Sequence, residues 1–333
     1  MILPWKMVFF NLLIMGSIFS ISASSWFMAW VGLEMNMLAI LALLMNFSSP
    51  REKEATLKYF LIQALASSVL LSTALFAASL QQGLSNLSVN SFLIFFSLLM
   101  KMGAAPFHLW LPQVVEGLSW SNSFIILSWQ KIAPSALLLN CFEVKHNLMS
   151  SLLLVAAFSA VFGALGGLSQ TSLRKILSFS SINHLGWALA SLSLGLKYWA
   201  IYFLLYCLLL FLVVVLTKMF NISSLTSSSL FPSKWAKVAF YSSLFSFGGL
   251  PPFMGFLPKW ILISKLIFLS PALTALLVMS SLPPLFFYLN LALLAMFNKT
   301  KNFFVQNMRT KIPTIVVTLN ILLAPTISLV LMW

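Results

Sequence analysis

The sequence predicts an all-α protein that crosses a membrane many times. Of its 333 residues, 61% are hydrophobic and only 7% are charged, whereas soluble domains carry about 25% charged residues. This leaves too few polar side chains to cover a soluble core. Long apolar segments separated by short polar breaks are the second indication, because each is long enough to cross a bilayer. A polytopic membrane protein is therefore the expected fold class.

About eleven transmembrane helices are expected. Two of the segments contain clusters of glycine and proline, which remove backbone donors and should break the helix. The last segment contains Pro325, where a kink is expected. The predicted spans are 3–21, 25–46, 56–79, 90–116 (broken), 119–141, 148–169, 172–194, 198–220, 235–268 (broken), 272–297 and 312–332.

Several features are missing from the sequence. The first apolar segment has no cleavable presequence pattern, so we expect it to remain a membrane helix. Cys141 and Cys207 fit no metal-ligand spacing and are expected to pack in the core. Neither a glycine-rich phosphate loop nor a histidine and cysteine cluster occurs, so we expect no bound cofactor or metal.

The basic residues predict the orientation. With eleven alternating spans, thirteen lie on the side of the N-terminus, two (Lys145 and Lys197) lie on the other side, and four fall within spans. By the positive-inside rule, the N-terminal side is the matrix or cytoplasmic face. The net charge of +14 is scattered over short loops, which indicates contact with anionic lipid rather than nucleic acid. The thirteen are Lys6, Arg51, Lys53, Lys58, Arg174, Lys175, Lys218, Lys234, Lys237, Lys299, Lys301, Arg309 and Lys311.

The two broken spans occupy matching places. When spans 1–5 and 6–10 are grouped, the fourth member of each group is broken, around 103–106 and 248–252. The groups start on opposite sides because five is odd, which is the pattern of an inverted-repeat transporter. We therefore predict one transmembrane domain, with inverted five-helix repeats over 1–146 and 147–297 and a C-terminal loop and helix over 298–333. We find no accompanying repeat of residues.

Ionisable side chains inside the spans are the candidate site. At 1.5 Å per residue, Lys101 lies roughly 15 Å into its span, Glu34 roughly 13 Å and Lys131 roughly 18 Å. Each such charge costs about 3 kcal/mol or more unless it is compensated. Lys259 directly follows the second break. A structural Glu34–Lys101 pair is the alternative, but three lysines exceed the one acid, and buried amines exchange protons readily. We predict a proton relay.

Other ionisable residues carry weaker signals. His108 follows the first break, and His184 lies among serines and an asparagine in the seventh span. Each can take part in a relay or in packing, and both alternatives stay open. Lys265 is expected to extend toward the membrane surface, Glu116 to be solvated at a helix end, and His146 to lie on a surface loop.

Four stretches, in order along nearly the whole chain, carry a resemblance. They are Lys101-Met-Gly-Ala-Ala-Pro-Phe-His-Leu-Trp-Leu-Pro112, Trp129-Gln-Lys-Ile-Ala-Pro134, Leu173 to Trp187, and Gly248-Gly-Leu-Pro-Pro252 with Gly255-Phe-Leu-Pro-Lys-Trp260. Together they resemble the chain 2 family of NADH–ubiquinone oxidoreductase, the antiporter-like subunits of respiratory complex I in animal mitochondria. The shortened animal form of that family has eleven helices.

The resemblance implies a proton-translocating subunit of an NADH:ubiquinone reductase with no redox centre of its own. It implies that Glu34 and Lys101 form a switching pair, that Lys131 is the central relay and that Lys259 leads to the exit half-channel. His108 and His184 are further relay candidates.

The resemblance also implies a setting. The chain is expected in the mitochondrial inner membrane, encoded in the organelle, with its N-terminus in the matrix and its C-terminus in the intermembrane space. NADH, FMN, iron–sulfur clusters and ubiquinone would be bound elsewhere in the complex. The expected partners are other membrane-arm and accessory subunits and phospholipids such as cardiolipin.

Two other functions stay open. A free-standing sodium–proton antiporter of the same fold would need no partner complex and would depend on sodium. A structural scaffold does not explain lysines at mid-depth, and it predicts that lysine-to-alanine changes have no effect on transport.

Overall fold

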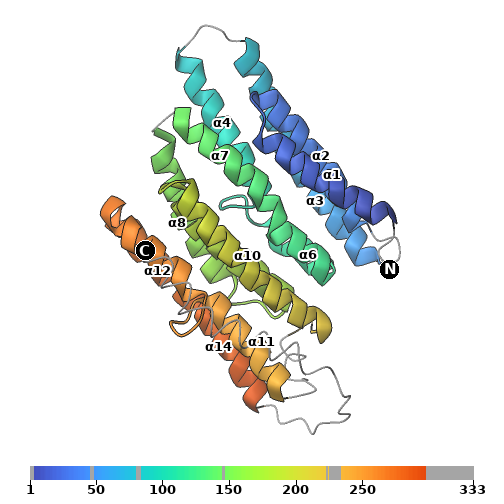
Figure 1. Ribbon diagram of the computed structural model, residues 1–333, viewed down its shortest axis with the longest axis vertical. Coiled ribbons are helices and arrows are strands. Elements are labelled where there is room, and N and C mark those ends of the chain that lie inside the picture. The colour runs from blue at the N-terminus through green and yellow to red at the C-terminus, as the bar shows by residue number, and fades with distance from the viewer. Residues whose placement is uncertain are drawn as a thin grey trace. The chain divides into compact units, whose positions relative to one another are not determined.

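The computed structural model describes residues 4–45, 49–79, 84–144, 147–222, 224 and 234–297. Within these ranges the regular structure is helical, apart from one isolated bridge between Ser172 and Ser224 (Figure 1). The predicted all-α class is confirmed. The predicted span 312–332 and the loop residue His146 lie outside the described residues.

The chain divides into two compact units, Met1–Val155 and Ala156–Trp333. In the first unit, α1 packs along α2, α2 along α3, and α3 along both α4 and α5. The side-chain hydroxyl of Ser25 accepts a hydrogen bond from the Met28 N–H at 3.3 Å and so caps the start of α2. The helices of this unit are α1 (Pro4–Ile21), α2 (Trp26–Leu44), α3 (Pro50–Ser79), α4 (Leu84–Met102), α5 (Trp110–Gly117), α6 (Trp120–Leu127), the 3-10 turn η1 (Trp129–Lys131) and α7 (Ile132–Val144), and α8 (Asn147–Gly166) carries the boundary.

In the second unit, α10 packs against α9, α11 and α12, and α11 packs against α14. Although α9 has a polar sequence, 17 of its 20 residues are buried. Close contact with α8 is possible because a Cβ at Gly186 would lie only 2.8 Å from the Ala160 backbone nitrogen. The helices are α9 (Leu173–Leu192), α10 (Leu196–Met219), α11 (Lys234–Gly248), α12 (Phe256–Leu269), α13 (Pro271–Ser280) and α14 (Leu282–Phe297).

Apolar surfaces and helix lengths fit a membrane. Large hydrophobic side chains such as Leu61 on α3 and Leu204 on α10 are exposed, which suits contact with lipid rather than water. Two shorter helices, Trp5–Ile21 and Asn90–Met102, are also apolar. Six segments of the described chain are long and apolar enough to cross a bilayer: Trp26–Leu44, Pro50–Phe76, Trp120–Cys141, Leu148–Gly166, Leu196–Met219 and Pro271–Leu293.

The predicted breaks in the fourth and ninth spans are confirmed. The chain leaves helix between α4 and α5, over 103–109, and between α11 and α12, over 249–255. In both places a glycine ends the first helix, and the second helix begins seven residues later, at Trp110 and at Phe256.

The expectation of only two broken helices is wrong, because segments 119–141 and 272–297 are also interrupted. Between α6 and α7 the chain forms the 3-10 turn η1, where Pro134 supplies no N–H for the Gln130 carbonyl. Between α13 and α14, Pro284 likewise supplies none for Ser280. The Ser280 carbonyl instead accepts a hydrogen bond from the side-chain amide of Asn183 at 2.9 Å.

Candidate functional site

Lys101 lies in the last turn of α4, where the helix ends in a Schellman motif. The Gly103 N–H bonds the Met100 carbonyl at 3.2 Å, and the Ala104 N–H bonds the Leu99 carbonyl at 3.1 Å. Gly103 has a φ of +72°, a conformation that glycine adopts without steric cost. The Lys101 side chain is only 5% exposed, so the ammonium is held inside the first unit at a helix break.

Two further contacts fix this helix end. The side-chain amide of Gln63, on α3, donates to the Lys101 carbonyl at 3.2 Å. The indole N–H of Trp110, at the start of α5, donates to the Met100 carbonyl at 3.2 Å. The Lys101 carbonyl, which has no intrahelical donor, thus receives one from α3, and the Met100 carbonyl receives a second donor from α5.

Glu34, on α2, lies within electrostatic range of Lys101 and of the buried Tyr59. The carboxylate and the ammonium form no direct ion pair in the described chain. An ion pair joins Lys58 and Glu54 at 2.6 Å, one turn apart near the exposed start of α3. A contact between Glu34 and Lys101 through one water stays a prediction.

Lys131 is the last residue of η1 and is 2% exposed. Its N–H bonds the Ser128 carbonyl at 3.1 Å, which closes the 3-10 turn. Both η1 and α7 pack against α4, the helix that carries Lys101. The sequence placed Lys131 inside a continuous span, whereas the structure places it at a third interruption.

His108 lies in the link between α4 and α5. Its side chain is 8% exposed, and it interacts with the backbone of Pro106 in the same link. His108 therefore lies within the first break, where its ring interacts with the backbone of the same link.

Lys259, on α12, reaches back to the end of α11. Its ammonium donates to the Gly248 carbonyl at 2.7 Å and lies 5.9 Å from the centre of the Trp187 ring. The helix ends in the same Schellman motif as α4, since the Gly249 N–H bonds the Ser246 carbonyl at 3.1 Å and the next N–H bonds Phe245 at 3.2 Å.

His184 also contacts the end of α11. Its Nε2 lies 3.1 Å from the Phe247 carbonyl oxygen, and its Nδ1 lies 2.8 Å from the Tyr202 hydroxyl of α10. Sequence reasoning expected the nearby serines and Asn183 to surround this ring. The Asn183 amide instead bonds the Ala160 and Ser280 carbonyls, at 2.8 and 2.9 Å. Tyr202 was missed, and no local pattern could have indicated it, because the contact spans 18 residues between two helices.

The two main breaks are identical at five of eleven positions in one register, a local similarity in a chain without a visible repeat of residues over its whole length. Stretches 103–113 (GAAPFHLWLPQ) and 249–259 (GLPPFMGFLPK) share glycine, proline, phenylalanine, leucine and proline at equivalent places. In this register Lys101 corresponds to Phe247, and Lys259 corresponds to Gln113. The lysines therefore lie on opposite sides of equivalent breaks.

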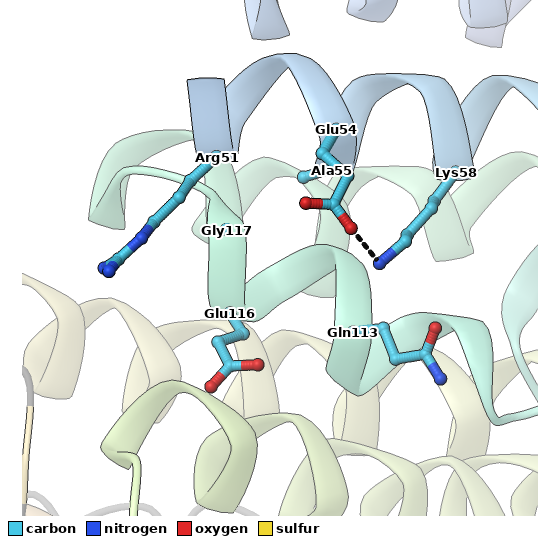
Figure 2. Close-up of a pocket in the computed structure, with 7 residues that line it drawn as sticks. All are labelled: Arg51, Glu54, Ala55, Lys58, Gln113, Glu116 and Gly117. Carbon is cyan, nitrogen blue, oxygen red and sulfur yellow. Dashed lines mark ion pairs between the residues drawn. The ribbon is translucent and has the colours of Figure 1, made fainter. Parts of the chain in front are cut away.

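A polar pocket of about 340 Å³ opens beside the first break (Figure 2). Glu116, predicted to be solvated at a helix end, is exposed there. A Cβ at Gly117 would lie 2.8 Å from the Arg51 carbonyl oxygen, so α5 and α3 meet closely at this point. The lining residues are Arg51, Glu54, Ala55 and Lys58 of α3 and Gln113, Glu116 and Gly117 of α5.

The remaining candidates are less involved. Lys265 is exposed on α12, and its extension toward the membrane surface stays a prediction. Cys141 is a buried free thiol and Cys207 a half-buried one. Within the described ranges, no group of three or more histidine, cysteine or acidic side chains is arranged to hold a metal ion.

A family model and a similar protein of known family indicate the same family for this chain. The family model described as NADH:quinone oxidoreductase/Mrp antiporter, TM, matches residues 23–283. The NADH-ubiquinone oxidoreductase chain 2 of Anopheles gambiae is 42% identical over 303 residues, which cover 89% of this chain and 87% of that protein.

Solved structures share the fold. A chain of respiratory complex I from Thermus thermophilus superposes with a TM-score of 0.75 and 25% identity, over 93% of this chain and 75% of that one. A chain of the Mrp complex from Dietzia superposes with a TM-score of 0.76 and 21% identity, over 85% of this chain and 59% of that one. The second likeness is one of fold alone.

Proposed function

Because the chain belongs to the NADH:quinone oxidoreductase/Mrp antiporter family of membrane proteins, we infer that it is a proton-translocating membrane subunit of respiratory complex I. The observation that carries this function is the position of three lysines, Lys101, Lys131 and Lys259. Each is at most 5% exposed and lies at or beside an interruption of a membrane helix. Buried amines at helix breaks suit the uptake and release of protons.

The first unit contains the switching part of the relay. A change of charge at Glu34 acts on the protonation of Lys101, because the two groups are within electrostatic range. The proton then passes to Lys131, whose turn η1 packs on the helix that carries Lys101. His108 supports the first break and is a secondary relay candidate.

The second unit contains the release part. Lys259 receives the proton and leads to the exit half-channel, with His184 of α9 as its neighbour at the end of α11. The non-equivalent positions of Lys101 and Lys259 across matching breaks support different roles, one for uptake and one for release.

An inverted repeat explains the matching breaks. We assign the five-helix repeats to 1–146 and 147–297, followed by a C-terminal loop and helix over 298–333. The shared residues of 103–113 and 249–259 support this assignment, as do the further interruptions in the fifth member of each group. Eleven spans with the N-terminus in the matrix and the C-terminus in the intermembrane space follow from the charge bias.

The chain works as one part of a larger enzyme. NADH, FMN, iron–sulfur clusters and ubiquinone are bound by other subunits, and quinone reduction there drives the relay here. The partners are membrane-arm and accessory subunits and phospholipids of the mitochondrial inner membrane, with cardiolipin among them. Relatives named NADH-ubiquinone oxidoreductase chain 2 support this setting.

A free-standing cation–proton antiporter is the second candidate. The fold shared with the Mrp complex favours it. Such a protein would exchange sodium for protons without an electron donor, whereas a complex I subunit moves protons only when NADH is oxidised.

Purification from mitochondrial membranes tests the proposal. The chain should co-purify with an assembly that oxidises NADH and reduces quinone, and reconstituted vesicles should acidify only with both substrates present. If the isolated chain alone exchanged sodium for protons and joined no such assembly, the antiporter function would replace the one proposed.

A further inference from the structure

We propose that the carboxyl end of α11 is a charge site shared by His184 and Lys259, which holds one protonated side chain at a time. Gly249 is the positioning residue that lets Lys259 reach it. This proposal rests on the proposed function, because the shared site is one step of that proton relay. The two side chains meet there at consecutive backbone carbonyls, those of Phe247 and Gly248.

The second unit offers no carboxylate side chain as a counter-charge. All five glutamates of the protein precede residue 156, and the sequence has no aspartate. Lys101 has Glu34 of its own unit within electrostatic range, whereas within the second unit a negative partner for a cation has to come from the backbone. The C-terminus of an α-helix supplies one, since its aligned peptide dipoles amount to roughly half a negative charge.

The two side chains complete the end of α11. The carbonyls of Phe245 and Ser246 are already bonded by the N–H groups of the Schellman turn. The next two carbonyls, of Phe247 and Gly248, have no intrahelical donor. The His184 ring takes the first at 3.1 Å, and the Lys259 ammonium takes the second at 2.7 Å.

The geometry also defines which nitrogen of His184 gains a proton. A carbonyl oxygen can only accept, so Nε2 carries a hydrogen in both charge states. Nδ1, 2.8 Å from the Tyr202 hydroxyl, accepts from that hydroxyl when the ring is neutral and donates to it when the ring is charged. In the exchange, an N–H bond breaks at Lys259 Nζ and one forms at Nδ1, so the total charge is conserved.

Two charges at one helix end repel each other, which limits the site to one. Within the part of the chain that the structure describes, the other titratable side chains near this end are phenols and a thiol, none of which is anionic at neutral pH when unperturbed. Tyr206 and Cys207 lie beside each other on α10, with the Tyr206 ring 5.3 Å from that of His184. The Tyr288 ring lies 6.4 Å from that of Phe247.

Gly249 makes room for Lys259. A Cβ at this position would lie 2.8 Å from the lysine Nζ and 3.1 Å from its Cε. Gly249 also has a φ of +89°, which disfavours any other residue. Gly195 provides a matched control in the same unit, because its φ is +113° and a Cβ there would meet nothing within 4 Å.

The first test compares Gly249→Ala with Gly195→Ala in assembled complex I, reconstituted in vesicles. Protons moved per electron and NADH–quinone reductase rate are measured per assembled complex. We expect Gly249→Ala to lower the proton-to-electron ratio to that of Lys259→Met, and Gly195→Ala to keep the wild-type ratio. Equal proton-to-electron ratios for the two glycine variants would overturn the proposal. The space that Gly249 leaves for Lys259 would then have no effect beyond that of a strained backbone.

A double-mutant cycle remains decisive if Gly249→Ala does not assemble. It compares His184→Gln, Lys259→Met and both changes together. For a shared site we expect the proton-to-electron ratio of the double variant to equal that of the more strongly affected single variant. Effects of the two changes that multiply would overturn the proposal. The proposed function can fail separately: if Lys259→Met alone left the ratio unchanged, the relay through Lys259 would be wrong.

Discussion

The side-chain amide of Asn183 joins two helices at their backbones, donating to the Ala160 carbonyl of α8 at 2.8 Å and to the Ser280 carbonyl of α13 at 2.9 Å. The second bond replaces the one that Pro284 cannot make. A polar residue in the buried helix α9 thus stabilises the interruption between α13 and α14.

Replacing Asn183 by alanine should therefore destabilise the protein. The buried Ser280 carbonyl loses its donor, which costs about 1–3 kcal/mol, and the Ala160 carbonyl loses a second donor besides that of its own helix. We expect a lower thermal midpoint for the assembled complex. Ser193→Ala is the control, because the Ser193 hydroxyl donates to the Ala190 carbonyl within its own helix, at 2.7 Å, and joins no second helix in this bond. Equal midpoints for the two variants would contradict the role assigned to Asn183.

Gln63→Leu should disturb the end of α4. The change keeps a side chain of similar size but removes the donor to the Lys101 carbonyl, leaving a buried acceptor unsatisfied at a cost of about 1–3 kcal/mol. We expect a lower thermal midpoint together with a reduced proton-to-electron ratio, because the carbonyl belongs to Lys101 itself. Ser68→Ala, on the exposed face of the same helix, should change neither quantity. If Gln63→Leu kept the wild-type proton-to-electron ratio, this bond at the end of α4 would have no part in the relay.

Lys131→Met tests the lateral relay. Methionine keeps much of the volume and removes the titratable amine of a side chain that is 2% exposed. We expect assembly to be preserved and the proton-to-electron ratio to fall, while Lys265→Met, on an exposed lysine, leaves the ratio at the wild-type value. If Lys131→Met kept both the ratio and the quinone reductase rate, the lysines would be structural rather than part of a relay.

The sequence predicted the helices and the two main breaks because those features are local. Gly103 and Gly249 stand where a left-handed residue must end a helix, and the prolines that follow reinforce the signal. Pro134 is also a local signal for the interruption at η1. Because its missing N–H affects the carbonyl of Gln130, four residues earlier, it predicted one lost hydrogen bond rather than a break of the helix.

The contacts of the site were beyond local reasoning. His184 meets Phe247 across 63 residues, and Gln63 meets Lys101 across 38. Such pairs depend on how helices pack, which hydrophobic periodicity does not specify for helices that are apolar on every side. Lys101 and Lys131 are buried within the protein, whereas their position at mid-depth of a bilayer stays a prediction.

Glu34→Gln tests the switching pair. Glu34 is half-buried and within electrostatic range of Lys101, and its negative charge attracts the protonated amine. Glutamine keeps the size and polarity but removes that attraction, so the proton-to-electron ratio should fall as far as in Lys101→Met, with the complex still assembled. Glu116→Gln is the matched control, because Glu116 is exposed at the end of α5.

The double variant Glu34→Gln with Lys101→Met makes the test specific. If the two residues act as one switching pair, their effects on the ratio should not multiply, and the double variant should behave as Lys101→Met alone. Effects that multiply would assign Glu34 to a separate step. A Glu34→Asp variant should retain part of the ratio, because it keeps the charge and shortens the side chain by one methylene, whereas a purely steric role would make Glu34→Asp the more damaging of the two single changes at this position.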